Sequence, residues 1–139
     1  MDDLVEVARL FDNYRQFYGQ APNPDLARSF ISGRLGNGDS VILLAQLRQA
    51  SVGFAQLYPS FSSVSATRTW ILNDLYVCER NRRHGMGKML LDAATQYARS
   101  TGASRLSLAT AVSNRAAQTL YEASGWQRNS EFIHYSFLL

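Results

Sequence analysis

The sequence contains one cysteine, one lysine and no apolar run of transmembrane length. A single cysteine, Cys78, excludes an internal disulfide, and its place in the apolar stretch LNDLYVCE favours a small strand residue over a nucleophile. No apolar run approaches the roughly 20 residues that span a bilayer. The acidic start, MDDLVEVARLF, lacks the basic region of a signal peptide. We therefore expect a soluble, cytoplasmic protein without membrane contacts.

Dense basic stripes are also absent. The net charge is +3, and arginine supplies all of the 14 basic residues except Lys88. Arginine suits phosphate because its planar fork matches the oxygen geometry. Nucleic-acid-binding proteins, however, usually concentrate basic residues on one stripe or face. We therefore predict an anion-binding protein with no nucleic-acid partner and no metal cofactor.

The length and composition predict one domain over residues 1–139. Hydrophobic residues make up 46% of the chain, which is enough for one core, and no repeat or linker interrupts it. Apolar residues at helical spacing, with capping signals and closing glycines, predict four helices. These cover residues 2–19, 24–38, 87–102 and 113–125.

Five apolar or alternating segments predict strands. They cover residues 40–47, 52–59, 67–79, 104–110 and 134–139, with a turn at 48–51 and a polar loop at 60–66. The first two would form a hairpin, and residues 67–79 would form a central strand. Helices and strands in this order predict a mixed α/β sheet.

The segment RNRRHGMGKMLL, residues 80–91, places two glycines between basic side chains and a helix. Glycine is unfavourable inside a helix, so Gly85 and Gly87 suggest a backbone that must approach a ligand closely. The first amides of a helix lack internal partners and attract anions. The spacing matches neither a Walker loop nor the dinucleotide fingerprint. A tight turn with exposed arginines would explain the same residues.

A second segment, NRAAQTLYEASGW, supplies the context. Residues 82–87 match the pattern Arg/Gln-x-x-Gly-x-Gly/Ala, and residues 114–126 match Asn-x-x-Ala-x-x-Leu-Tyr-x-x-x-Gly-Phe/Trp. Together the two segments resemble the GCN5-related N-acetyltransferases, the GNAT superfamily, over roughly residues 40–139. The resemblance implies a mixed, mainly antiparallel sheet whose central strands splay into a V, with helices on both faces.

The resemblance implies that acetyl-CoA donates its acetyl group to a primary amine of a small molecule, which attacks the thioester directly. The central strand would bind the pantetheine arm through its backbone, like an added strand, and the glycine loop would hold the diphosphate. The implied coenzyme-binding residues are Leu75, Tyr76, Val77, Arg82, Arg83, His84, Gly85, Met86, Gly87, Lys88, Asn114, Ala117 and Tyr121. Asn114 also fits a helix cap, and both roles stay open.

Two residues are implied for catalysis. In the family, a tyrosine at the position of Tyr121 protonates the departing thiolate. An acidic residue in the central strand serves some relatives as the base that deprotonates the amine, and Asp74 is the candidate here. A structural role for Asp74 stays equally open, and Glu79 is a second choice.

The acceptor wall is implied to include Tyr14, Tyr18 and Phe61. Aromatic rings suit a cationic amine, and Arg15 would suit a carboxylate, although packing in the core would explain each aromatic residue equally well. Acetylation of a protein lysine or N-terminus and a non-catalytic acyl-CoA-binding module are the alternatives. The family usually begins with a strand before the first helix, whereas this sequence starts almost at the helix, so that strand is either absent from the protein or outside these residues. Its loss would expose a sheet edge and could favour a homodimer.

Overall fold

Two helices open the chain, as the apolar spacing predicts. The computed structural model describes residues 3–139, beginning with α1 (Asp3–Phe17) and α2 (Pro24–Asn37). Asn23 caps α2, because its side chain accepts a hydrogen bond from the backbone N–H of Leu26 at 3.1 Å. Gly38 ends α2 in the left-handed conformation, with φ of 64°.

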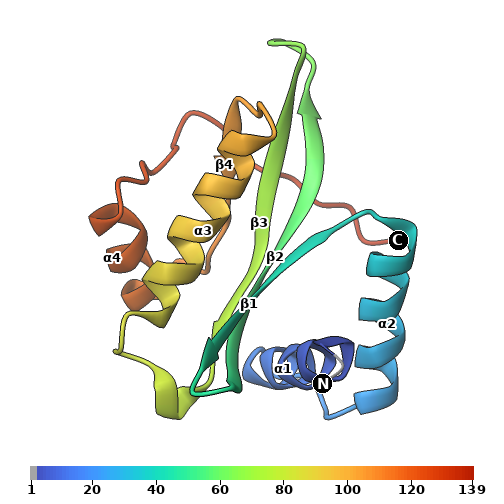
Figure 1. The fold of residues 1–139 in the computed structure, drawn as a ribbon. Helices are drawn as coiled ribbons and strands as arrows, with labels where there is room; N and C mark the ends of the chain where they lie inside the picture. The colour runs from blue at the N-terminus through green and yellow to red at the C-terminus, as the bar shows by residue number, and fades with distance from the viewer. Residues whose placement is uncertain (1–2) are drawn as a thin grey trace. The chain divides into compact units, whose positions relative to one another are not determined.

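Within residues 3–139, the sheet contains four strands in the order β1-β2-β3-β4 (Figure 1). They are β1 (Val41–Leu47), β2 (Ala50–Ser62), β3 (Thr67–Val77) and β4 (Arg105–Ser107). The first three pair antiparallel, and β4 pairs parallel to β3. The predicted class, a mixed and mainly antiparallel α/β sheet, is confirmed.

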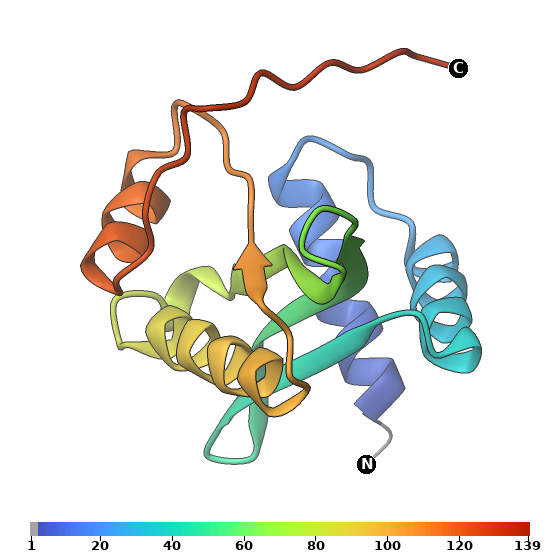
Figure 2. The ribbon, with the colours of Figure 1, turned by 90° about the horizontal axis from the view of Figure 1, so that it is seen from above.

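Helices cover both faces of this sheet. A short 3₁₀ turn, η1 (Glu79–Asn81), leads from β3 to α3 (Met86–Ser100). Figures 1 and 2 show α3 on one face and α1 and α2 on the other. The amphipathic pattern of α3 explains its position, because Leu90, Leu91, Ala94 and Ala98 are all buried.

The chain divides after Ala109 into two units, which we describe separately. The first unit contains the sheet and the first three α-helices. The second, residues 110–139, contains α4 (Arg115–Ala123), which the sequence also predicts. The single domain expected from the length and composition stays a prediction.

The core of the first unit lies between α1, α2 and the sheet. Leu10, Ile31 and Phe54 are fully buried there, and Phe11 stacks on Phe30 across the two helices with ring centroids 5.3 Å apart. This packing fixes the two helices against the central strands. Within residues 3–139, no helix is long and apolar enough to cross a membrane.

Several predicted boundaries are wrong. The turn predicted at residues 48–51 contains only residues 48–49, because Ala50 and Ser51 already pair with β1, and the strand predicted over residues 67–79 ends at Val77. Residues 60–62 continue β2 instead of forming a loop, because residues 67–69 of β3 are paired with them across the ladder. The strand predicted at residues 104–110 shortens to Arg105–Ser107, where β3 is its partner. Residues 134–139 form no strand. Alternating apolar residues favour a strand, but a strand also needs a partner strand to which its backbone can hydrogen-bond. Residues 110–139 contain no strand.

Candidate active site

A bulge in β3 shapes the candidate site. Gln56 of β2 pairs with Asp74, whereas the next residue, Leu57, pairs with Leu72. Asn73 is therefore an extra residue on β3, opposite no partner. Such an insertion shifts the alternation of side chains by one position, so residues after it point to the opposite face from the one expected.

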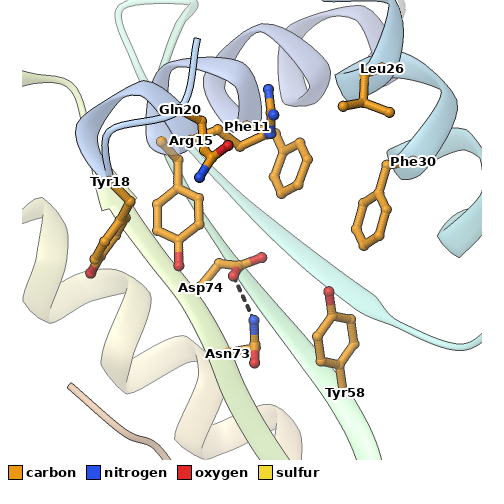
Figure 3. Close-up of a pocket in the computed structure, with 10 residues that line it drawn as sticks. Phe11, Arg15, Tyr18, Gln20, Leu26, Phe30, Tyr58, Asn73 and Asp74 are labelled. Atoms are coloured by element: carbon orange, nitrogen blue, oxygen red, sulfur yellow. Dashed lines mark hydrogen bonds between the residues drawn. The ribbon is translucent and has the colours of Figure 1, made fainter. Parts of the chain in front are cut away.

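The aromatic contacts of β3 follow this change of face. Before the bulge, Trp70 contacts Tyr97 of α3, with ring centroids 5.4 Å apart. After the bulge, Tyr76 contacts Tyr14 of α1 on the other face of the sheet, at 6.2 Å. Asp74 consequently points toward α1 and α2 and away from α3 (Figure 3).

Asp74 is a buried carboxylate held by two amides. The residue is only 3% exposed. One carboxylate oxygen accepts a hydrogen bond from Nε2 of Gln56 at 2.5 Å, and the other accepts one from Nδ2 of Asn73 at 2.8 Å. Gln56 is fully buried, and its Oε1 has no hydrogen-bond partner within residues 3–139. The site therefore contains the carboxylate of Asp74 and a second buried hydrogen-bond acceptor, Oε1 of Gln56.

Asp74 opens into a pocket of about 400 Å³ between α1, α2 and strands β2 and β3. Figure 3 shows aromatic rings on several sides of this space and the carboxylate at its base. The lining residues are Phe11, Tyr14, Arg15, Tyr18, Gln20, Leu26, Phe30, Tyr58, Asn73 and Asp74. A carboxylate among aromatic rings suits a cationic amine, because both the charge and the ring faces attract it.

Two pocket phenols have raised pKa values. Burial raises the pKa of Tyr14, and the charge of Asp74 and a hydrogen bond with it raise this pKa further. Burial also raises the pKa of Tyr58, with a further contribution from Asp74. Both hydroxyls therefore remain protonated at physiological pH and able to donate hydrogen bonds to the carboxylate or to a ligand.

Beyond the bulge, no strand of residues 3–139 pairs with the edge of β3 that faces away from β2. β4 pairs with β3 only at Thr69–Ile71, so the two strands separate there. The N–H of Cys78 bonds to the carbonyl of Val52 in β2 at 2.8 Å. Antiparallel alternation then directs the backbone of Tyr76 toward β2 and that of Leu75 and Val77 toward the open edge.

Arg82 connects the glycine loop to this edge. Its Nε donates a hydrogen bond to the carbonyl of Val77 at 2.8 Å. Its guanidinium lies over the rings of Phe17 and Tyr76, 5.1 and 5.6 Å from their centroids. These contacts give Arg82 a structural role at the end of β3. Lys88 pairs with Asp92 at 2.7 Å, although both side chains are exposed.

The start of α3 has the features of an anion site. Gly85 precedes the helix with φ of 80°, and no side chain of the described residues caps the first amides. A Cβ on Gly85 would meet nothing within 4 Å, so the left-handed backbone, not crowding by the protein, explains this glycine. The first turn carries no acidic residue. Arg83 is exposed beside it, in the left-handed region with φ of 67°.

The second unit contains the other predicted coenzyme residues. Oδ1 of Asn114 accepts a hydrogen bond from the N–H of Ala117 at 3.2 Å, so the predicted helix cap is present. The ring of Tyr121 lies 6.1 Å from that of Trp126. The roles of Asn114, Ala117 and Tyr121 toward a coenzyme stay predictions.

The pocket unites only some of the predicted acceptor residues. Tyr14, Tyr18 and Asp74 line it together, whereas Phe61 is 71% exposed near the tip of the β2–β3 hairpin, beneath the guanidinium of Arg68. Sequence reasoning missed the contribution of Gln56. Its signal is a lone amide in the apolar run VGFAQLYP, which a simple strand interpretation ignores.

Comparisons with known proteins assign the family. The model of the Acetyltransferase (GNAT) family matches residues 5–126. A protein of Bacillus subtilis (strain 168) named "Uncharacterized N-acetyltransferase YhfO" is 47% identical over 96% of this chain and 89% of its own length. A crystal structure described as "a probable acetyltransferase" has a TM-score of 0.92 and 44% identity, covering 98% of this chain and 91% of the other.

More distant relatives carry similar names. N-acetyltransferase family 8 member 3 of Rattus norvegicus is 29% identical over 79% of this chain, which spans 46% of that relative. The protein belongs to the GNAT acetyltransferase family, as its two sequence motifs predict. It is therefore an acyl-CoA-dependent N-acetyltransferase.

Proposed function

We propose that the protein transfers the acetyl group of acetyl-CoA to the primary amine of a small molecule bound in the pocket beside Asp74. The observation that carries this proposal is the buried carboxylate at the Asn73 bulge, inside an aromatic pocket and next to the open edge of β3. A pocket of this volume falls within the range that small ligands occupy.

The residues of the first unit fit the coenzyme at two places. The open edge of β3 offers the N–H groups of Leu75 and Val77 and the carbonyl of Leu75 to the amides of the pantetheine arm. The uncapped amides of residues 86–88, with Arg83 beside them, suit the diphosphate. Acetyl-CoA supplies an activated acetyl thioester when it is bound.

Two side chains complete the proton balance. An alkylamine with a pKa near 10 is mostly protonated at pH 7, and Asp74 accepts the proton that its nitrogen must lose before it attacks. The carbon–nitrogen bond forms as the carbon–sulfur bond breaks. Tyr121 donates its hydroxyl proton to the departing sulfur, so that the thiol leaves neutral. The nitrogen then loses its second proton to the Tyr121 phenolate, which yields the neutral amide and restores the hydroxyl.

Asp74→Asn tests the base. We expect kcat/KM to fall by about two to four orders of magnitude, with unchanged affinity for acetyl-CoA, when thiol release is followed with a panel of amines. The residual rate should rise with pH because more of the amine is then unprotonated. Asp25→Asn, at an exposed carboxylate in α2, is the matched control. Full activity of Asp74→Asn would leave Asp74 a structural acceptor.

Tyr121→Phe tests the proton donor. Thiol release should slow by about two to four orders of magnitude, because the hydroxyl that protonates the sulfur is removed. Tyr135→Phe, at an exposed position in the same unit, should behave like the wild type. Unchanged turnover of Tyr121→Phe would exclude this role for the tyrosine.

A further inference from the structure

Two charged side chains of opposite sign line the pocket: Asp74 at its base and Arg15 on α1. The side chain of Arg15 is 18% exposed, so most of its surface is withdrawn from solvent. Arg15 is also the one cationic residue among the side chains that line the pocket in residues 3–139. Figure 3 shows the rings of Phe11 and Phe30 in the same pocket as the carboxylate of Asp74.

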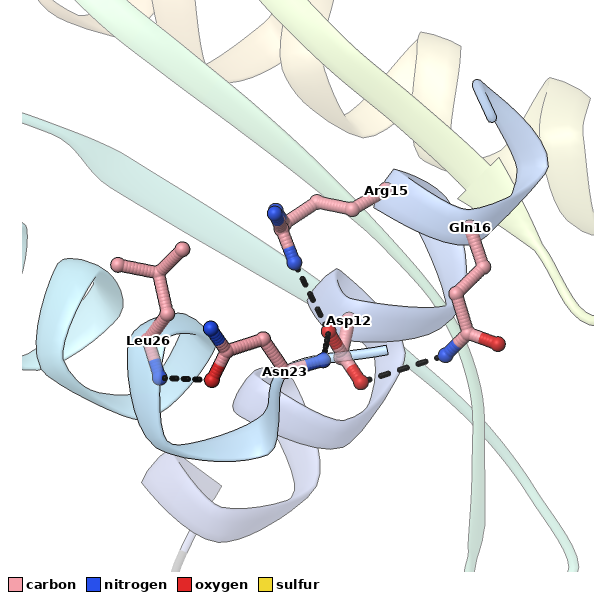
Figure 4. Close-up of polar contacts among 5 residues, drawn as sticks. All are labelled: Asp12, Arg15, Gln16, Asn23 and Leu26. Atoms are coloured by element: carbon pink, nitrogen blue, oxygen red, sulfur yellow. Dashed lines mark hydrogen bonds and ion pairs between the residues drawn. The ribbon is translucent and has the colours of Figure 1, made fainter. Parts of the chain in front are cut away.

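Asp12 positions Arg15 but accepts a hydrogen bond from only part of its guanidinium. Nη1 of Arg15 donates to Oδ1 of Asp12 at 3.1 Å (Figure 4). Asp12 also accepts the backbone N–H of Asn23 at 3.1 Å and the amide of Gln16 at 3.2 Å, so neutral donors share its charge. A guanidinium carries five N–H donors, and within residues 3–139 one of those of Arg15 is paired with a carboxylate.

We propose that the acceptor is an amine that also carries a carboxylate, with the amine at Asp74 and the carboxylate at Arg15. This inference rests on the proposed function and narrows its substrate class. A zwitterion with an apolar spacer would satisfy both charges and place its spacer among Phe11, Leu26 and Phe30. A polyamine would instead bring a second cation toward Arg15, and such like-charge contacts disfavour a ligand.

Matched pairs of amines test the proposal. The panel contains ω-amino acids of increasing length with the n-alkylamines of the same length, and an aromatic α-amino acid with its decarboxylated amine. Thiol release from acetyl-CoA gives kcat/KM for each. We expect the wild type to prefer the carboxylate-bearing member of at least one pair by about tenfold to a hundredfold, as a charge-assisted hydrogen bond provides.

Arg15→Gln should abolish this preference. The value of kcat/KM should fall more for the amino acid than for the alkylamine, so that their ratio approaches one, whereas Arg15→Lys should retain part of the preference because the charge remains. The ratio of kcat/KM for the amino acid to kcat/KM for the alkylamine, measured with one variant, does not depend on the fraction of folded protein. Arg28→Gln removes the same charge from an exposed position of α2 and should keep the wild-type ratio.

The outcomes separate this inference from the proposed function. Turnover of the alkylamines equal to or faster than that of every matching amino acid would overturn the inference and leave acetyl transfer to amines standing. An equal loss for both members of a pair in Arg15→Gln would also overturn it. No thiol release with any amine would refute the proposed function, and the inference with it.

Discussion

At the scale of single residues, Asp74 depends on its immediate neighbours. An ionised carboxylate is costly to bury unless hydrogen bonds replace its water. The amides of Gln56 and Asn73 provide these bonds, one from the partner strand and one from the bulge itself. Polar residues that look misplaced in two apolar strands therefore form one local arrangement around the carboxylate.

The raised pKa of Tyr14 predicts a dependence of stability on pH. The folded protein retains the phenolic proton where the unfolded chain loses it, above about pH 10. The stabilisation is therefore complete below pH 10 and is lost as the pH rises above it, by up to about 1.4 kcal/mol per pH unit. Tyr14→Phe lacks this contribution, so its unfolding free energy should decline less steeply.

Urea unfolding at pH values from neutral to above 10 measures this effect. At neutral pH, Tyr14→Phe should already be less stable by about 1 kcal/mol, because the interaction of the Tyr14 hydroxyl with Asp74 is lost. Tyr135→Phe, where the ring is exposed, should follow the wild-type curve. Parallel curves for the wild type and Tyr14→Phe would show that the Tyr14 proton is not linked to folding.

At the scale of elements, the close approach of β2 and β3 depends on Gly53. A Cβ at this position would lie 2.7 Å from the backbone carbonyl of Tyr76, which cannot move as a side chain can. Gly53→Ala should lower the free energy of unfolding by about 1–3 kcal/mol because the strands must separate locally.

Gly33→Ala, inside α2, should instead raise the free energy of unfolding. Its Cβ would meet nothing within 4 Å, and alanine is the better helix former by about 0.8–1 kcal/mol. Denaturant midpoints of both variants measure the contrast. Equal midpoints for Gly53→Ala and the wild type would contradict the tight β2–β3 contact.

Elements also show where sequence prediction succeeds and fails. The predicted helices are present because helical spacing, the Asn23 and Asn114 caps and the closing glycines are local signals. The longer β2 was missed because its polar end is stabilised by residues 67–69, which lie beyond a turn. Asn73 carries no local sign of a bulge, since the bulge is defined only by the register against β2.

At the scale of the whole molecule, coenzyme binding should leave a specific pattern of protected amides. The N–H groups of Leu75 and Val77 and those of residues 86–88 should exchange more slowly with deuterium when acetyl-CoA is added, because the proposed site uses them. The amide of Tyr76 should change little, since antiparallel alternation already directs it to β2. Hydrogen exchange followed by NMR measures each amide.

A truncated donor separates the two parts of this site. S-acetylpantetheine has the arm but no diphosphate, so it should protect Leu75 and Val77 and leave residues 86–88 unchanged. The turn at Arg48–Gln49 should be unaffected by either molecule. Protection of Tyr76 alone, or of none of these amides at saturating acetyl-CoA, would contradict the proposed placement of the coenzyme.

The sequence by itself determined the family, the helices and the residue types of the glycine loop, because these are written in short segments whose parts lie within a few turns of the chain. Only the tertiary structure decided which predicted residues meet. It directed Arg82 to the carbonyl of Val77, excluded Phe61 from the pocket that Tyr14, Tyr18 and Asp74 share, and brought Gln56 to the carboxylate. Strand register and helix packing join residues far apart in the chain, and no local pattern specifies those contacts.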